Sequence, residues 1–142
     1  MMNSYKQDPN RPTGLSTSSL EGTKVYNFNN EHIGEIKDYV VDLDNGNVMY
    51  GVLSFGGFMG IGDKYFAVPW NAMTIDTENK CIRFDATTES LENAPGFDKN
   101  HWPSTGDHAF TDEVYEYYGY EPYSTWRERT FADYRVRELE TV

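Results

Sequence analysis

Residues 53–70 of this 142-residue chain read Leu-Ser-Phe-Gly-Gly-Phe-Met-Gly-Ile-Gly-Asp-Lys-Tyr-Phe-Ala-Val-Pro-Trp. Both ends of the stretch have the aromatic and aliphatic composition of strands, and Pro69 suits the end of a strand because it cannot donate to a sheet ladder. The glycines between them predict a loop with tight turns or positive φ angles. Almost none of these side chains can do acid–base chemistry. The stretch therefore indicates a fold element and a contact surface rather than a catalytic centre.

Further strand-like runs lie on both sides of this stretch. Asn45-Gly46 separates two of them and predicts a two-residue hairpin turn, in which both residues adopt positive φ. The adjacent Val40 and Val41 break the alternation of their run and predict a β-bulge or burial on both faces. About six short strands with tight turns predict a mainly β fold, a small antiparallel barrel or sandwich. The predicted strands are residues 24–28, 33–43, 48–55, 64–69, 74–76 and 81–85.

The segments outside the predicted strands differ in composition. Residues 1–19 are polar, with Ser, Thr, Asn and Pro, and we expect a disordered leader without a secretory signal. Residues 20–103 form the predicted barrel domain with an extended segment at its end. Residues 104–142 are a Tyr-rich, acidic extension with short helices, for which Thr111 and Thr125 are the expected N-caps.

The charge distribution limits the class of partner. The formal net charge is -11, and residues 104–123 contain five acids without any Lys or Arg. Binding to nucleic acid or to an anionic membrane depends on clustered basic residues, so neither is expected as a direct partner. No run approaches the length of a membrane span, and the cytoplasm is the expected compartment.

The reactive side chains show no catalytic or metal-binding pattern. Cys81 is the only cysteine, and its place in a predicted strand indicates a buried structural residue. The spacing of the three histidines matches no standard zinc site. Asp42 and Asp44 are similar to the start of a calcium loop, but Leu53 stands where its Glu is required. We expect no enzyme activity, no cofactor and no metal site.

The glycine-rich loop is the first candidate contact surface. Its glycines do not match a dinucleotide-binding fingerprint, which opens a helix rather than a strand. Its apolar side chains can fold back over the end of the barrel, or they can form an exposed patch for a partner or a second copy. The apolar candidates are Phe58, Met59 and Ile61, and the glycines expected to set the loop geometry are Gly56, Gly57, Gly60 and Gly62.

A tyrosine cluster is the second candidate contact surface. Five tyrosines lie within residues 115–123, interleaved with glutamates. Tyrosine supplies a large contact area at low entropic cost and is common at interfaces. The cluster can pack on its own barrel, or it can serve as an arm for a dimer or another partner, with Tyr117, Tyr118 and Tyr120 as the expected contacts.

Several dispersed motifs together resemble the PRC-barrel family. They include Ile33-Gly34-Glu35-Ile36, Val48-Met-Tyr-Gly-Val-Leu-Ser-Phe-Gly-Gly57 and Phe66-Ala-Val-Pro-Trp70, and the resemblance covers roughly residues 20–103. It implies a small antiparallel β-barrel that serves as a docking or assembly module without a shared catalytic set. The family includes a domain of the photosynthetic reaction-centre H subunit, a domain of a ribosome-maturation factor, and small stand-alone bacterial members linked to stress response.

These observations favour a non-enzymatic protein-interaction or assembly module that self-associates as a homodimer. One alternative is a ribosome-maturation factor that binds a basic ribosomal protein. Another is an accessory protein of a membrane redox or photosynthetic complex. An enzyme or small-ligand carrier is the remaining alternative, although small barrels usually fill their interior with side chains.

Overall fold

Seven strands form one mixed sheet in the computed structural model, which describes residues 10, 12–55 and 64–130. The strand order is β5-β6-β1-β2-β3-β4-β7, with β5 and β7 at the edges. The strands are β1 (Lys24–Tyr26), β2 (His32–Val41), β3 (Val48–Phe55), β4 (Lys64–Pro69), β5 (Met73–Asp76), β6 (Cys81–Phe84) and β7 (Gly96–Asp98). The helices are α2 (Thr17–Leu20), α3 (Thr88–Glu92) and α4 (Ala109–Tyr117), with a 3₁₀ turn η1 (Trp70–Ala72) and a further helical segment over residues 123–130.

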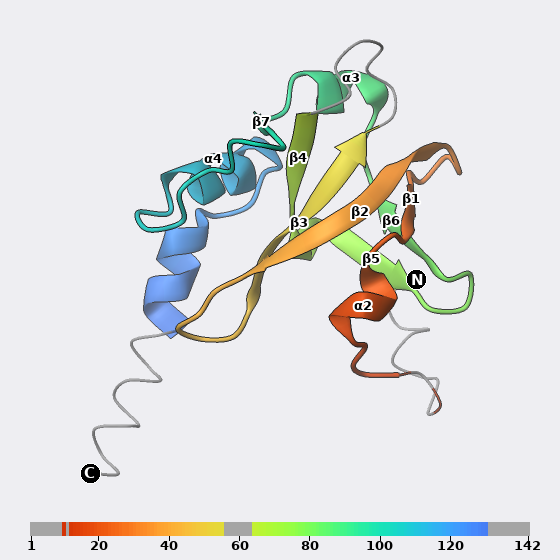
Figure 1. Cartoon of the computed structure of the whole chain (residues 1–142), viewed down its shortest axis with the longest axis horizontal. Helices are drawn as coiled ribbons and strands as arrows, with labels where there is room; N and C mark the ends of the chain where they lie inside the picture. The colour runs from red at the N-terminus through yellow and green to blue at the C-terminus, as the bar shows by residue number, and fades with distance from the viewer. Residues whose placement is uncertain (1–9, 11, 56–63, 131–142) are drawn as a thin grey trace.

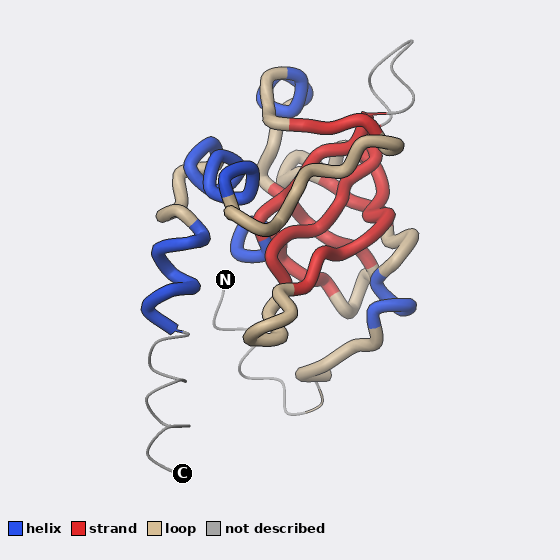
Figure 2. The backbone as a smooth tube through the Cα atoms, turned by 60° about the vertical axis from the view of Figure 1, so that its left-hand side comes forward, coloured by secondary structure: helices blue, strands red, loops and turns tan. Residues whose placement is uncertain are grey.

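The mainly β, barrel-type architecture is confirmed, but three details of the prediction are wrong. The sheet has seven strands because residues 96–98, expected only as extended chain, pair with β4. The pairing of β1 with β6 is parallel, although the other pairs are antiparallel. The sheet curls without closing, since β5 and β7 remain its two edges (Figure 2).

Strand β3, which lies between β2 and β4, is buried on both faces. Leu53 and Phe55 point into one core together with Phe66 and Val68 of β4. Tyr50 and Val52 face the other way, into a second cluster that contains the side chains of α4. A strand covered on both sides is expected to be apolar at every position rather than alternating. The sequence of β3 therefore reflects the second layer formed by the C-terminal extension.

The C-terminal extension lies on one side of the sheet and α2 on the other (Figure 1). α4 packs on β4, and the helix over residues 123–130 lies beside the β2–β3 hairpin. On the opposite side, helix α2 begins where the side chain of Ser16 accepts a hydrogen bond from the Ser19 amide. α2 therefore lies next to the expected domain boundary at residue 20.

The β2–β3 hairpin differs from the predicted two-residue turn. Only Gly46 of its loop has positive φ, at 78°, whereas the prediction required this of Asn45 as well. The Gly46 amide donates to the Asp42 carbonyl at 2.8 Å, which closes a wider loop. The Asp42 carboxylate also accepts the Asp44 amide at 2.9 Å, and this local bond favours the wider loop. The predicted bulge is confirmed by a register shift between Val40 and Val41.

The two C-terminal helices begin earlier than predicted. α4 begins after His108, which has a left-handed φ of 60°, and the Asp107 side chain accepts the Ala109 amide. Thr111 is consequently inside the helix and buried. In the last helix the Ser124 amide donates to the Asp112 carboxylate at 2.7 Å. This cap comes from α4, so the local Thr125 motif does not set the start of the helix.

Candidate functional site

The candidate site is the C-terminal extension and the sheet surface beneath it. We call residues 109–130 the arm. Its tyrosines bond to backbone carbonyls of distant segments: Tyr115 Oη donates to Met49 O at 2.6 Å, and Tyr117 Oη donates to Ser90 O at 2.6 Å. Tyr120 Oη donates to Asn71 O at 3.3 Å. These contacts join the arm to β3, α3 and η1.

The tyrosine rings also pack against the barrel. Tyr118 lies edge-on to Phe84 with ring centroids 5.3 Å apart, and it contacts both hydrophobic clusters. Burial raises the pKa of Tyr115 to about 12, so its hydroxyl remains a hydrogen-bond donor at physiological pH. Tyr117 is the most exposed of these rings at 40%. Among the predicted contact residues, Tyr117, Tyr118 and Tyr120 therefore lie together and all contact the protein's own barrel.

An ion-pair cluster fixes the last helix to the β2–β3 hairpin. Arg127 Nε donates to Asp42 Oδ2 at 2.6 Å, and Arg127 Nη2 binds Asp44 Oδ2. Tyr123 Oη donates to the same Asp42 oxygen at 2.6 Å. Asp42 and Tyr123 are buried, with 4% and 1% exposure. We call these four residues the Asp42 cluster.

The electrostatics of the Asp42 cluster favour the ionised pair. Burial alone would raise the pKa of the Asp42 carboxyl, but the hydrogen bonds from Arg127 and Tyr123 outweigh it and hold that pKa below its usual range. Asp42 in turn raises the pKa of Arg127. Burial, and after it the same carboxylate, raises the pKa of Tyr123. The cluster is thus a charged contact completed by hydrogen bonds, the arrangement that a buried carboxylate requires.

Sequence reasoning missed the role of this cluster. The sequence predicts a hairpin turn at Asp42 and Asp44 and no calcium site, but it does not predict that both carboxylates bind the guanidinium of Arg127. Asp42 and Arg127 are 85 positions apart, so no local spacing pairs them. The one available signal was the Tyr123 and Arg127 spacing, which places both side chains on one face of a helix. Within the described part of the chain no group of three His, Cys, Asp or Glu residues could hold a metal ion.

The glycine-rich loop lies outside the described residues. Its predicted contact residues Phe58, Met59 and Ile61, and its glycines Gly56, Gly57, Gly60 and Gly62, remain predictions.

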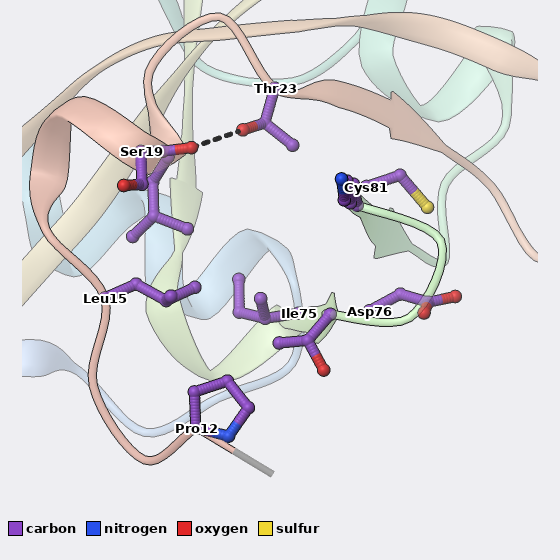
Figure 3. Close-up of a pocket in the computed structure, with 10 residues that line it drawn as sticks. Pro12, Leu15, Ser19, Thr23, Ile75, Asp76 and Cys81 are labelled. Carbon is purple, nitrogen blue, oxygen red and sulfur yellow. Dashed lines mark hydrogen bonds between the residues drawn. The ribbon is translucent and has the colours of Figure 1, made fainter. Parts of the chain in front are cut away.

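A shallow groove of about 310 Å³ lies on the other side of the molecule, between the N-terminal segment and the β5–β6 hairpin. Leu15 and Ile75 face one another across it (Figure 3). Asp76, at its rim, binds Asn79 and pairs with Arg83 at 3.4 Å. Cys81 is buried at its end as predicted, and burial raises the pKa of its thiol. A thiol in this setting is not activated as a nucleophile.

The comparison with protein families identifies the barrel. Residues 12–91, more than half of the chain, match the PRC-barrel domain. The chain belongs to the PRC-barrel domain family. Strand β7 and the arm lie beyond the matched residues, so the Asp42 cluster joins a PRC-barrel hairpin to a segment outside the family match.

Comparisons with individual proteins add little to the family assignment. No curated protein matches the chain. Among solved structures, a putative 16S ribosomal RNA processing protein, RimM, from Pseudomonas aeruginosa is similar, with 16% identity and a TM-score of 0.40. That match covers 58% of this chain and 49% of the other, so the present chain spans about half the length of its solved relative.

Proposed function

We propose that this PRC-barrel protein is a non-enzymatic interaction module that binds a basic protein surface through the outer face of its arm. The observation that carries the proposal is the charge of that face. Four acids of the arm are exposed: Glu113, Glu116, Glu121 and Glu128. Of the two arginines in the same range, Arg127 binds the Asp42 carboxylate and Arg129 binds Glu121 at 2.8 Å.

Exposed aromatic side chains accompany these acids. Tyr117 is partly exposed on α4, and Trp102, 43% exposed, packs against Phe97 just before the arm, with tilted rings. Aromatic residues with a charged rim are typical of protein interfaces. Complementary charge raises the rate of encounter with a basic partner and makes binding sensitive to salt. The acidic face therefore supports a protein partner, and it opposes direct contact with nucleic acid.

A basic ribosomal protein is one form of this partner, and it suits the alternative role in ribosome maturation. No helix in the described part of the chain combines the length and apolarity needed to cross a bilayer. The proposal does not need a membrane, because it rests on a protein contact.

The test compares charge reversal on the arm with charge reversal elsewhere. One full chain carries Glu113→Lys and Glu116→Lys on the arm, and the control full chain carries Glu78→Lys and Glu92→Lys. All four positions are exposed, and the two variants change the net charge by the same amount. Each variant is mixed with purified small ribosomal subunits, and separately used for affinity capture with identification of bound proteins. Each experiment is run at low and at moderate salt.

We expect basic proteins to bind the wild type and the Glu78/Glu92 control at low salt and to dissociate at moderate salt. The Glu113/Glu116 variant should bind these basic proteins at least tenfold more weakly at low salt. Equal retention by both variants would contradict the proposed face. If the wild-type protein is absent from the small-subunit fractions but captures other basic proteins, the ribosomal partner is excluded and the proposed interaction module stands.

A further inference from the structure

The loop of the β2–β3 hairpin contains the one Asn-Gly pair of the chain, Asn45-Gly46. Asparagine followed by glycine is prone to deamidation, because glycine has no Cβ to hinder attack of its backbone nitrogen on the preceding side chain. Gly46 is exposed, so water reaches this loop. The pair is therefore a candidate site of spontaneous chemical modification.

Deamidation of this pair proceeds through a cyclic imide. The Gly46 nitrogen bonds to the side-chain carbonyl carbon of Asn45 and loses its proton, while the C–N bond of the side-chain amide breaks. The released nitrogen takes up a proton and leaves as ammonia. Water then opens the imide at either carbonyl carbon, which gives aspartate or isoaspartate. Both products carry a carboxylate in place of the neutral amide, and the reaction needs no oxidant or reductant.

The folded loop holds both reacting groups in hydrogen bonds. The Gly46 amide donates to the Asp42 carbonyl at 2.8 Å, and Asn45 Oδ1 accepts the Asn47 amide at 2.9 Å. The attacking nitrogen thus has its proton bonded, and the side-chain carbonyl of Asn45 is turned toward another amide. The imide forms only after these two bonds open.

The arm keeps this loop closed. Asp42 and Asp44, which precede the pair, bind Arg127. The side-chain nitrogen of Asn45 is shielded from solvent and has no hydrogen-bond partner among the described residues. It lies near the Tyr123 hydroxyl, whose pKa burial and Asp42 raise and the Asn45 side chain lowers. A buried donor without an acceptor is costly, so the amide keeps this position only while the arm covers it.

A carboxylate at position 45 changes the charge balance beneath the arm. Arg127 already binds the carboxylates of Asp42 and Asp44, and a further negative charge beside them is repelled. Isoaspartate also adds a methylene group to the backbone of the loop, which shifts Asp44 relative to Gly46. Either product therefore weakens the contact between the hairpin and the last helix.

We propose that Asn45 is a deamidation site that the arm protects, and that the aspartate or isoaspartate formed there loosens the arm. Opening of the arm exposes the site, and reaction at the site favours the open arm. The inference does not depend on the proposed basic partner, because the exposed glutamates of the arm take no part in it.

Peptide mass spectrometry on full chains tests the site and its protection. Wild type, Arg127→Ala and Arg129→Ala are incubated at mildly alkaline pH, and the converted fraction of Asn45 is followed with time. The wild-type chain unfolded in urea gives the unprotected rate, and the exposed Asn79 and Asn100 are internal references. Circular dichroism reports whether each variant is folded, and Arg127→Lys replaces Arg127→Ala if the latter is not.

In the unfolded chain Asn45 should react roughly tenfold faster than the reference asparagines, and in the folded wild type roughly tenfold more slowly than in the unfolded chain. Arg127→Ala should remove most of this protection while the barrel stays folded. Arg129→Ala, which lacks only the exposed pair with Glu121, should react as the wild type does.

The effect of the product is measured separately with Asn45→Asp. Its control is Asn47→Asp, which adds the same charge at an exposed position of the same loop. Hydrogen exchange in residues 109–130 should be roughly tenfold faster in Asn45→Asp than in the control.

Three results would overturn the proposal. The first is a rate at Asn45 in the unfolded chain no higher than at the reference asparagines. The second is an equal rate at Asn45 in the folded wild type and in the folded Arg127 variant, since the arm would then give no protection. The third is equal hydrogen exchange of the arm in Asn45→Asp and Asn47→Asp. Each leaves the acidic-face proposal standing if basic proteins still bind.

Discussion

The barrel and the arm are held by different forces. The barrel core is apolar and continuous, with Ile36, Leu53, Phe66 and Ile82 fully excluded from solvent. The arm also buries apolar groups, but its orientation depends on individual hydroxyl bonds and on one ion-pair cluster. Hydrophobic burial is non-directional and distributed over many residues, whereas a buried ion pair depends on each partner. We therefore expect single polar changes to loosen the arm while the barrel stays folded.

The largest effect is expected in the barrel. Phe66→Ala removes a ring that is fully buried against Phe55, with ring centroids 6.2 Å apart. The free energy of unfolding should fall by about 4 kcal/mol, through lost burial and the cavity left behind. Urea denaturation followed by far-ultraviolet circular dichroism measures the change. A loss below about 1 kcal/mol would mean that the core collapses around the site and is less specific than the structure indicates.

The next effect separates the arm from the barrel. Arg127→Ala leaves Asp42 without its cation, and the free energy of unfolding should fall by about 3 kcal/mol. The matched control is Arg129→Ala, whose pair with Glu121 is 59% and 48% exposed and should contribute less than about 1 kcal/mol. Hydrogen exchange should be fastest in residues 109–130 of the Arg127 variant, while β1–β4 should remain protected. Uniformly faster exchange throughout would contradict the separation.

The same contrast explains how much the sequence could predict. The mainly β fold, the bounds of β3 and β4, and the bulge at Val40 and Val41 follow from local composition and alternation, and the structure confirms them. β7 could not be predicted in this way, because its three residues become a strand only through pairing with β4. The Asp42 cluster depends on a contact across 85 positions. The apolar residues on both faces of β3 were the one local sign that a second layer covers the sheet.

A smaller effect tests a backbone contact that supports the barrel. Strands β2 and β3 approach closely at Gly34, where an added Cβ would lie 2.2 Å from the Ser54 carbonyl oxygen. Gly34→Ala should therefore lower the free energy of unfolding by about 2 kcal/mol through overpacking. Gly14→Ala is the control, since nothing lies within 4 Å of its added Cβ. Thermal melts of the two variants should differ in midpoint, and equal midpoints would show that the strands separate at no cost.

The smallest effect is confined to acid pH and reports on the arm alone. Because the pKa of Asp42 is lower in the folded protein than its ordinary value, its contribution to stability is fully present above that ordinary value, near pH 4. The contribution is lost as the pH falls through the folded value. In Asp42→Asn it is absent at every pH, so the free energy of unfolding should decrease less between pH 5 and pH 2 than in the wild type. Urea titrations at several pH values measure that slope.

Asp76→Asn is the comparison, since the pKa of Asp76 is also lowered, first by the side chain and backbone of Asn79 and then by Arg83, within the β5–β6 hairpin. Both substitutions should flatten the slope, but only Asp42→Asn should also raise hydrogen exchange in residues 109–130. If Asp76→Asn loosens the arm equally, the arm and the barrel unfold as one unit and the distinction between them fails.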